Sequence, residues 1–199
     1  MNRNPPSTWR KEKRNMATKK AAVLLAEGFE ETEAVSIIDV LRRAQVETFI
    51  VSVSGAGPVT GAHDIRITAD RKLEELDVGQ LDAVVLPGGM PGAANLAGSE
   101  AVRELLRKAA AADLVIGAIC AGPIALAAAG VIKGRRATCY PGFEDRLNDA
   151  QVTGARVETD GRVVTGKGPG AALEFGLGLL EALDLDSEAG QLKEAMLVR

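Results

Sequence analysis

The sequence predicts a single α/β domain with a doubly wound, mostly parallel sheet and helices on both of its faces. Short apolar segments alternate with amphipathic ones along most of the 199 residues, which is typical of successive βαβ units. The candidate strands are continuously apolar, as expected for parallel strands buried on both faces. Hydrophobic residues make up 46% of the chain and charged residues 26%, which excludes a disordered chain.

The order of the segments places each element. Apolar runs predict core strands at 21–26, 81–86 and 114–119, with a further strand at 47–53 and an edge strand at 65–68. Residues 54–61 are expected to form a Gly/Pro turn. Helical spacing or capping predicts helices at 30–44, 99–112, from Pro123, at 170–183 and from Ser187. Short β segments are expected at 137–141, 151–153, 156–159 and 162–165, the last two joined by a turn at Asp160 and Gly161.

The first 19 residues are expected to form a basic, disordered extension ahead of one domain that spans 20–199. Residues 1–20 hold seven Lys or Arg and one Glu, a net charge of +6, so the remainder carries −9 of the total of −3. The extension has no aromatic interleaving, which argues against a specific nucleic-acid site. No apolar run reaches the ~20 residues of a membrane span. With two cysteines there is no disulfide framework, and we expect a cytoplasmic protein.

Cys120 lies where a predicted strand meets a predicted helix. Gly122 allows a tight turn there, and Pro123 fits the first turn of a helix. A cysteine on such a turn points across the helix N-terminus, whose dipole favours a thiolate. This is the arrangement of a nucleophile elbow, with sulfur in place of oxygen. A small buried apolar residue at a strand end explains the same pattern equally well.

Two other strand ends would meet Cys120 at the carboxyl edge of the sheet. Glu33, in the first turn of the first helix, could face the thiol and hold a proton, because burial and like charge raise a carboxyl pKa. Gly88 and Gly89 follow another strand and expose backbone N–H groups. The N–H groups of Gly89 and Ala121 could form an oxyanion hole, although a plain tight turn is the simpler explanation.

No cofactor or metal is expected. The glycines lack the spacing of a phosphate or nicotinamide loop, and two cysteines with one histidine would leave a tetrahedral metal site incomplete. That histidine, His63, lies on the segment before the predicted edge strand and suits an ordinary surface residue.

Four segments, in this order and spacing, strongly resemble the ThiJ/PfpI superfamily, specifically the branch of the parkinsonism-associated protein deglycase. They are AEGFEETE at 26–33, VLPGG at 85–89, AICAGP at 118–123, and GPG at 168–170 with Glu174 and Phe175. The resemblance runs from about Lys20 to the C-terminus. It implies a flavodoxin-like, class I glutamine amidotransferase-like fold and a homodimer.

The resemblance also implies roles for individual residues. Cys120 matches the family's oxidation-sensitive cysteine and Glu33 its protonated glutamate, while Gly89 and Ala121 match the oxyanion-hole donors. It implies action on small α-oxoaldehydes such as methylglyoxal, or on glycated proteins and nucleotides. The leading hypothesis is a cysteine-dependent deglycase or glutathione-independent glyoxalase. The alternatives are an oxidative-stress sensor or chaperone with little turnover, and a binding module without activity.

Three positions depart from relatives. Tyr140 stands where many members have a histidine before a proline, and a phenol is a poor base near neutral pH. His63 stands where some members have an arginine near the dimer contact. Ala121 replaces the histidine of the protease-like branch, which argues against proteolysis. Tyr140 and His63, together with Gly88 of the glycine pair, are considered as candidate substrate-site residues and not as catalytic residues.

Overall fold

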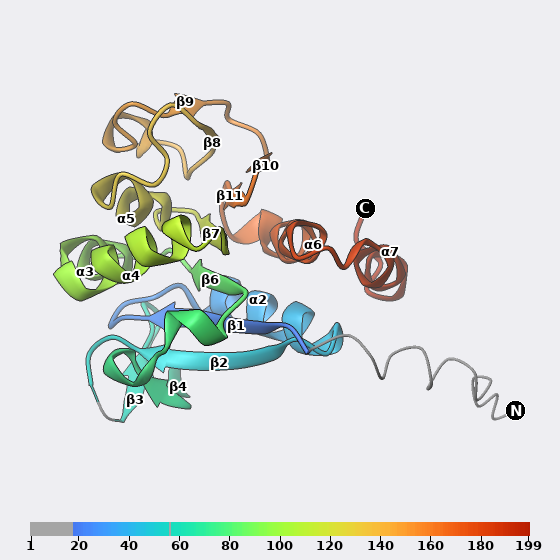
Figure 1. Cartoon of the computed structure of the whole chain (residues 1–199), viewed down its shortest axis with the longest axis horizontal. Helices are drawn as coiled ribbons and strands as arrows, with labels where there is room; N and C mark the ends of the chain where they lie inside the picture. Colours follow the sequence, from blue (N-terminus) through green and yellow to red (C-terminus); the bar gives the residue numbers. More distant parts are fainter. Residues whose placement is uncertain (1–17, 56) are drawn as a thin grey trace, which may run out of the picture.

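The computed structural model describes residues 18–55 and 57–199, and its centre is a seven-stranded sheet in the order β10-β11-β7-β6-β1-β2-β5 (Figure 1). Neighbouring strands run parallel, except that β10 and β11 form an antiparallel hairpin. The strands are β1 (Lys20–Leu25), β2 (Glu47–Ser52), β5 (Arg71–Lys72), β6 (Ala83–Leu86), β7 (Val115–Ile119), β10 (Val157–Asp160) and β11 (Val163–Gly166).

Helices cover both faces of this sheet in two groups. In one group α2 (Glu31–Arg43) packs on α6 (Ala172–Ala182), which packs on α7 (Asp186–Ala195). In the other, α3 (Gly92–Gly98), α4 (Glu100–Ala111) and α5 (Pro123–Ala128) pack together. The predicted doubly wound α/β fold is confirmed.

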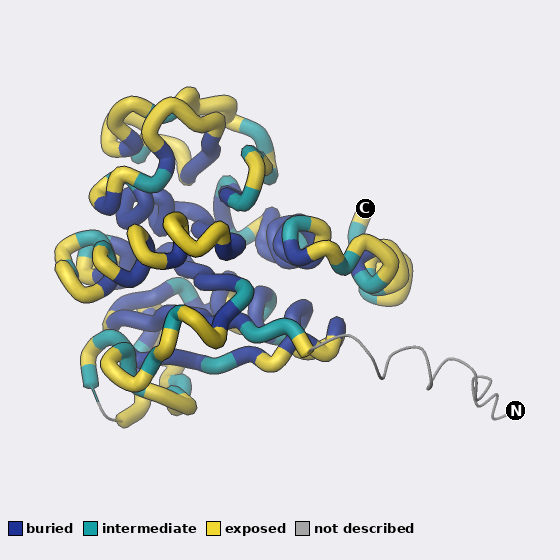
Figure 2. The backbone as a smooth tube through the Cα atoms, viewed as in Figure 1, coloured by how far each residue is buried: buried dark blue, intermediate teal, exposed yellow. Residues whose placement is uncertain are grey.

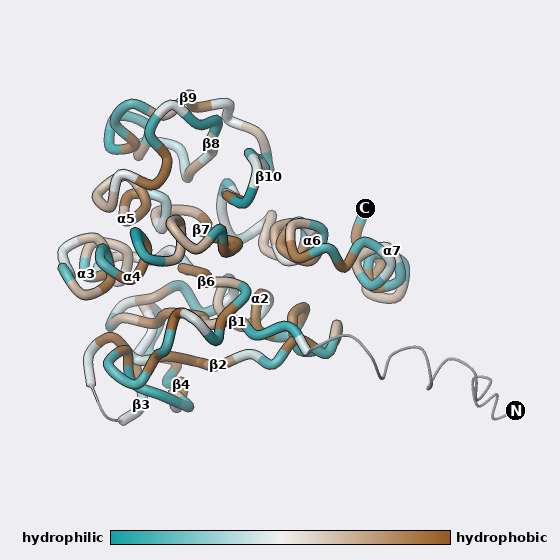
Figure 3. The backbone as a smooth tube through the Cα atoms, viewed as in Figure 1, coloured by the Kyte–Doolittle hydropathy of each residue, from teal (hydrophilic) through white to brown (hydrophobic). Residues whose placement is uncertain are grey.

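The core lies where the sequence is most apolar. Every residue of β6 and β7 is buried, and only Lys20 of β1 is partly exposed. Figure 2 shows these strands at the buried centre, and Figure 3 shows the outer loops as the more hydrophilic part of the chain. Because the central strands are dry on both faces, their carboxyl ends are held rigidly for a site.

Two helices begin at a residue whose side chain caps them, whereas α6 and α7 begin at Ala172 and Asp186 without a capping side chain. Glu30 caps α2, because its side chain accepts a hydrogen bond of 2.6 Å from the backbone N–H of Glu33. Ser99 caps α4 by accepting from Val102 N–H at 3.3 Å. Pro123 is the first residue of α5, where its missing N–H costs nothing. A hairpin turn joins β10 and β11 as predicted, but its two residues are Gly161, with a φ of +62°, and Arg162, because Asp160 pairs with Val163 in the ladder.

The segment after β2 differs from the prediction. Residues 58–61 are not simply a turn, because β3 (Pro58–Thr60) pairs antiparallel with β4 (Arg66–Thr68) in a separate two-stranded sheet. The edge of the main sheet on this side is instead β5, which the sequence did not predict. Asp70 directs β5 to this edge by accepting a hydrogen bond from Ile50 N–H of β2 at 2.9 Å.

Two more expectations need correction. The strand expected at 137–141 is confined to β8 (Arg136–Ala137), which pairs with β9 (Gln151–Val152) in a second small sheet. Helix α3 was not predicted, because its small residues give little helical pattern. The expected basic extension lies outside the described residues, apart from Thr18 and Lys19. No helix in the described ranges is both long and apolar enough to cross a membrane.

Candidate active site

Cys120 lies in a strained turn directly after β7. Its φ is +63°, in the left-handed region that residues with a side chain seldom adopt. Cys120 N–H donates to Gly166 O and Cys120 O accepts from Tyr140 N–H, both at 2.9 Å. Gly122 allows the close packing of this turn, because a Cβ there would lie 2.8 Å from Ile119 O. The strand, strained turn and helix are the geometry of a nucleophile elbow.

Glu33 lies in the first turn of α2 with a fully buried side chain. Its Oε2 accepts a hydrogen bond of 2.7 Å from Gly88 N–H, while Oε1 has no partner of normal geometry in the described part of the chain. Burial raises the pKa of this carboxyl to about 7, against the lowering effect of Gly88 N–H and the Cys120 thiol, and the charge of Glu30 adds to the rise. Near neutral pH the group can therefore both accept and donate a proton.

The Cys120 thiol differs from the thiolate expected from the sequence. Its side chain is only 8% exposed, and burial, followed by the nearby Glu33 charge, raises its pKa to about 12. The backbone N–H groups of Ala121 and Gly89 act in the opposite direction and lower this pKa, so both approach the sulfur. Burial outweighs the helix N-terminus, and Cys120 is a thiol beside a base.

The loop that carries Gly88 and Gly89 fits closely between Cys120 and α2. A Cβ on Gly88 would lie 2.6 Å from Cys120 Cβ and 2.9 Å from Glu33 Oε2. Gly89 has a φ of +86°, and a Cβ there would overlap the backbone N of Glu30. Glu30 N–H holds the loop in place by donating to Gly88 O at 2.9 Å. Only glycine fits both positions.

The structure thus gathers five of the expected residues around one sulfur: Cys120, Glu33, Gly88, Gly89 and Ala121. Tyr140 is adjacent through its hydrogen bond to Cys120 O, and its side chain is 46% exposed. The close approach of Gly88 to Cys120 is a steric role that the sequence reasoning missed. Its signal was the glycine pair directly after a buried strand.

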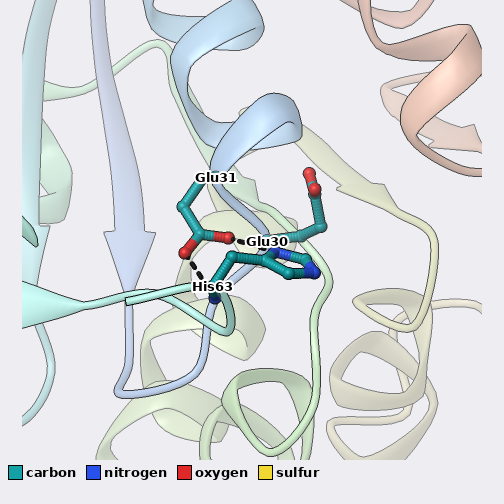
Figure 4. Close-up of side chains that lie close together, drawn as sticks. All are labelled: Glu30, Glu31 and His63. Atoms are coloured by element: carbon teal, nitrogen blue, oxygen red, sulfur yellow. Dashed lines mark hydrogen bonds and ion pairs between the residues drawn. The ribbon is translucent and has the colours of Figure 1, made fainter. Parts of the chain in front are cut away.

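His63 is not bonded to this group; it is held by Glu31, as Figure 4 shows. Glu31 Oε1 accepts from His63 N–H at 2.6 Å, and Oε2 lies 2.9 Å from His63 Nδ1. Burial opposes ionisation of Glu31, but the hydrogen bonds from His63 outweigh it and keep the pKa below its ordinary value. The same hydrogen bond raises the pKa of His63.

Glu30, Glu31 and His63 place three potential ligand atoms within 4.8 Å of one another. Protein donors already occupy the Glu31 oxygens and one oxygen of Glu30. We therefore infer that the role of this group is structural: it attaches the turn between β3 and β4 to the start of α2.

Comparison with known proteins identifies the family to which the chain belongs. The sequence model described as the DJ-1/PfpI family matches residues 19–182, most of the chain. The chain belongs to the DJ-1/PfpI family.

Three members of this family align with the chain over most of their lengths. The chain is 39% identical to the Parkinson disease protein 7 homolog of Danio rerio, over 92% of this chain and 100% of that protein. It is 35% identical to the glutathione-independent glyoxalase DJR-1.2 of Caenorhabditis elegans, over 85% of this chain and 91% of that protein. The crystal structure of Drosophila melanogaster DJ-1beta superposes with a TM-score of 0.88 at 35% identity, covering 92% of this chain and 100% of the other. The flavodoxin-like fold of the DJ-1 branch is confirmed.

Proposed function

We propose that the protein is a cysteine-dependent, glutathione-independent glyoxalase and deglycase that acts on methylglyoxal-type α-oxoaldehydes and their early adducts. The observation that carries the proposal is the position of the Cys120 thiol. It lies between two backbone N–H groups and a buried carboxyl whose pKa is about 7. The name of the related glutathione-independent glyoxalase supports this reaction class.

The reaction starts with addition of sulfur to the aldehyde carbon, C1, of methylglyoxal. Ionised Glu33 takes the thiol proton as the S–C1 bond forms, which solves the problem of a thiol with a raised pKa. The oxygen on C1 gains negative charge, and the N–H groups of Gly89 and Ala121 stabilise it. Protonation of this oxygen gives a hemithioacetal on Cys120.

Glu33 then moves a proton from C1 to C2 through an enediol. C1 is oxidised to the level of a thioester and C2 is reduced to an alcohol, so no external oxidant or reductant is needed. Water breaks the S–C1 bond, releases lactate and returns the proton to sulfur. In an early adduct, C1 carries the amine, guanidine or thiol of the modified residue. As the S–C1 bond forms, the bond from C1 to that group breaks, and Glu33 passes the proton taken from Cys120 to the departing group.

The test is lactate formation from methylglyoxal and from glycated N-acetyl amino acids. We expect Cys120→Ser to abolish turnover and Glu33→Gln to lower kcat by at least about a hundredfold, a typical contribution of a general base. The matched control is Cys139→Ser, since this buried second cysteine is not bonded to Glu33. Unchanged turnover in Cys120→Ser would overturn the proposal.

A second candidate function, a redox sensor, is favoured by the unpaired Glu33 Oε1. If peroxide oxidises Cys120 to a sulfinate, reducing each peroxide molecule to water, a protonated Glu33 can donate a hydrogen bond to a sulfinate oxygen. Mass spectrometry after mild peroxide should then find two added oxygens on Cys120 and none on Cys139. Equal oxidation of the two cysteines would contradict a sensing role.

We further propose that the chain forms a homodimer, as expected from the family resemblance. Two large apolar side chains stay exposed near Glu31: Val35 is 51% exposed on α2, and Ile65 is 57% exposed after the turn that Glu31 holds. Ile65 N–H lies 3.4 Å from Glu31 Oε1, so the two apolar residues belong to one region. A second copy of the chain would remove this area from water.

A further inference from the structure

Tyr140 is the only exposed aromatic residue in the described ranges. Phe29 and Phe175 are fully buried, and Phe49 and Phe143 are partly buried, whereas Tyr140 is 46% exposed. The chain has a single tyrosine, and its backbone N–H is hydrogen-bonded to the turn that carries the reactive cysteine.

The backbone of Tyr140 is fixed at both ends. Its N–H donates to Cys120 O at 2.9 Å, and its carbonyl accepts from Phe143 N–H at 3.1 Å. The edge of the ring packs on Gly168, where an added Cβ would lie 3.0 Å from Tyr140 Cδ2. Gly168 follows β11, which pairs with the strand ending at Ile119. The ring therefore lies at the carboxyl edge of the sheet, one strand from Cys120.

The ring position favours binding over proton transfer. The phenol has no hydrogen-bond partner among the residues that the structure describes. The same loop carries the Glu144 carboxyl group, whose Oε2 accepts from Gly142 N–H at 2.6 Å. The nearby cation of Lys167 is directed elsewhere, to Gly154 O at 3.0 Å. An exposed aromatic face is suited to a planar cation.

We propose that Tyr140 is a specificity-determining residue that receives the planar guanidine-derived group of methylglyoxal–arginine adducts. This inference rests on the proposed function and names its preferred substrate class. Adducts of lysine and cysteine lack the planar cationic group and would gain less from the ring. The fixed backbone lowers the entropy cost of presenting it.

Binding can be measured without turnover. In a Cys120→Ser background, calorimetry with Nα-acetylarginine, whose guanidinium is the planar cation that the proposal requires, should find binding weakened about tenfold by Tyr140→Ala and nearly preserved by Tyr140→Phe. Nα-acetyllysine, a cation that is not planar, is the comparison probe, and its binding should change less in Tyr140→Ala. Val152→Ala is the matched control, because Val152 is an exposed apolar residue of β9 outside the site. Equal binding by Tyr140→Ala and its parent protein would overturn the inference.

Steady-state kinetics of the protein with Cys120 intact provide an independent test. Tyr140→Ala should raise the ratio of KM for glycated Nα-acetylarginine to KM for free methylglyoxal about tenfold, while the ratio of kcat values stays constant. Gly168→Ala, which displaces the ring and keeps the phenol, should change the KM ratio in the same direction. A parallel rise of both KM values would reject Tyr140 as a specificity residue. Absence of turnover in the wild type would reject the proposed function instead, and the binding arm would still decide the role of Tyr140.

Discussion

Gly88 lies so close to Cys120 that a Cβ on the glycine would be 2.6 Å from the cysteine Cβ. The Gly88 N–H is also the hydrogen-bond donor to Glu33 Oε2. One residue therefore sets the separation of the thiol and the carboxyl. The reactive pair depends on the absence of a side chain at a position that is not itself reactive.

Gly88→Ala should therefore disrupt the site. The added methyl group must displace Cys120 or the loop, and a misplacement of about 1 Å lowers kcat/KM by about a hundredfold. Overpacking should also cost about 1–3 kcal/mol of unfolding free energy. Lactate assays and urea denaturation measure both effects.

The control for this variant is Gly98→Ala, because a Cβ on Gly98 meets no atom within 4 Å. Its kcat/KM should equal that of the wild type. A Gly88→Ala protein with full activity would refute the steric role.

Glu33 should make stability depend on pH. Below about pH 4.5 the carboxyl is protonated in folded and unfolded chains alike, and the unfolded chain loses the proton as pH rises through 4.5. The folded chain keeps it until about pH 7, so stability falls between these values and stays lower above them. The predicted loss is about 3 kcal/mol.

Urea denaturation of wild type and Glu33→Gln, from pH 4 to 8, isolates this contribution. The glutamine variant should lack the decline, and its stability relative to wild type should rise with pH. Parallel curves for the two proteins would mean that Glu33 ionises normally in the folded state.

Loss of the Glu31 carboxylate should lower the free energy of unfolding far more than loss of the His63 side chain. Glu31→Ala removes a buried acceptor that holds His63 N–H and Ile65 N–H, and should cost about 2 kcal/mol of unfolding free energy. His63→Ala keeps the backbone hydrogen bonds and should cost well under half as much. NMR titration should also find that Glu31→Gln lowers the pKa of His63. Equal destabilisation by both alanine variants would contradict the assigned role of Glu31.

A charged substitution at Val35, on α2, should disrupt the proposed homodimer. Light scattering should find a mass about twice the chain's 20.8 kDa for wild type and about 20.8 kDa for Val35→Lys, because the lysine places a charge in the apolar contact. Val152→Lys, at an exposed residue of β9, should remain dimeric. A monomeric wild type would refute the proposal.

The strands and the meeting of their carboxyl ends were predictable, because β1, β6 and β7 are apolar without interruption. The elbow at Cys120 was also predictable, since Gly122 and Pro123 mark its turn. The pairing of β3 with β4 was not predictable, because glycines at 55, 57 and 61 flank a strand of only three residues. The turn between these strands is also positioned by hydrogen bonds that its N–H groups donate to Glu31, a residue of a distant segment.

The state of the thiol could not be read from the sequence. The helix N-terminus beside Cys120 is visible in the pattern and favours a thiolate. The burial that leaves Cys120 8% exposed depends on the packing of the whole domain, and it raises the pKa instead. For Glu33 the expected rise in pKa is found, because burial and the charge of Glu30 outweigh the hydrogen bonds that favour the ionised form.

The hydrogen bond from Gly88 N–H to Glu33 Oε2 has a spectroscopic consequence. An amide proton shared with a carboxylate resonates at lower field than one shared with the neutral acid, so the Gly88 amide signal reports how much of Glu33 carries charge. In a chain labelled with ¹⁵N-glycine, that signal allows the acid–base state of the site to be followed in solution, without substrate and without a mutation.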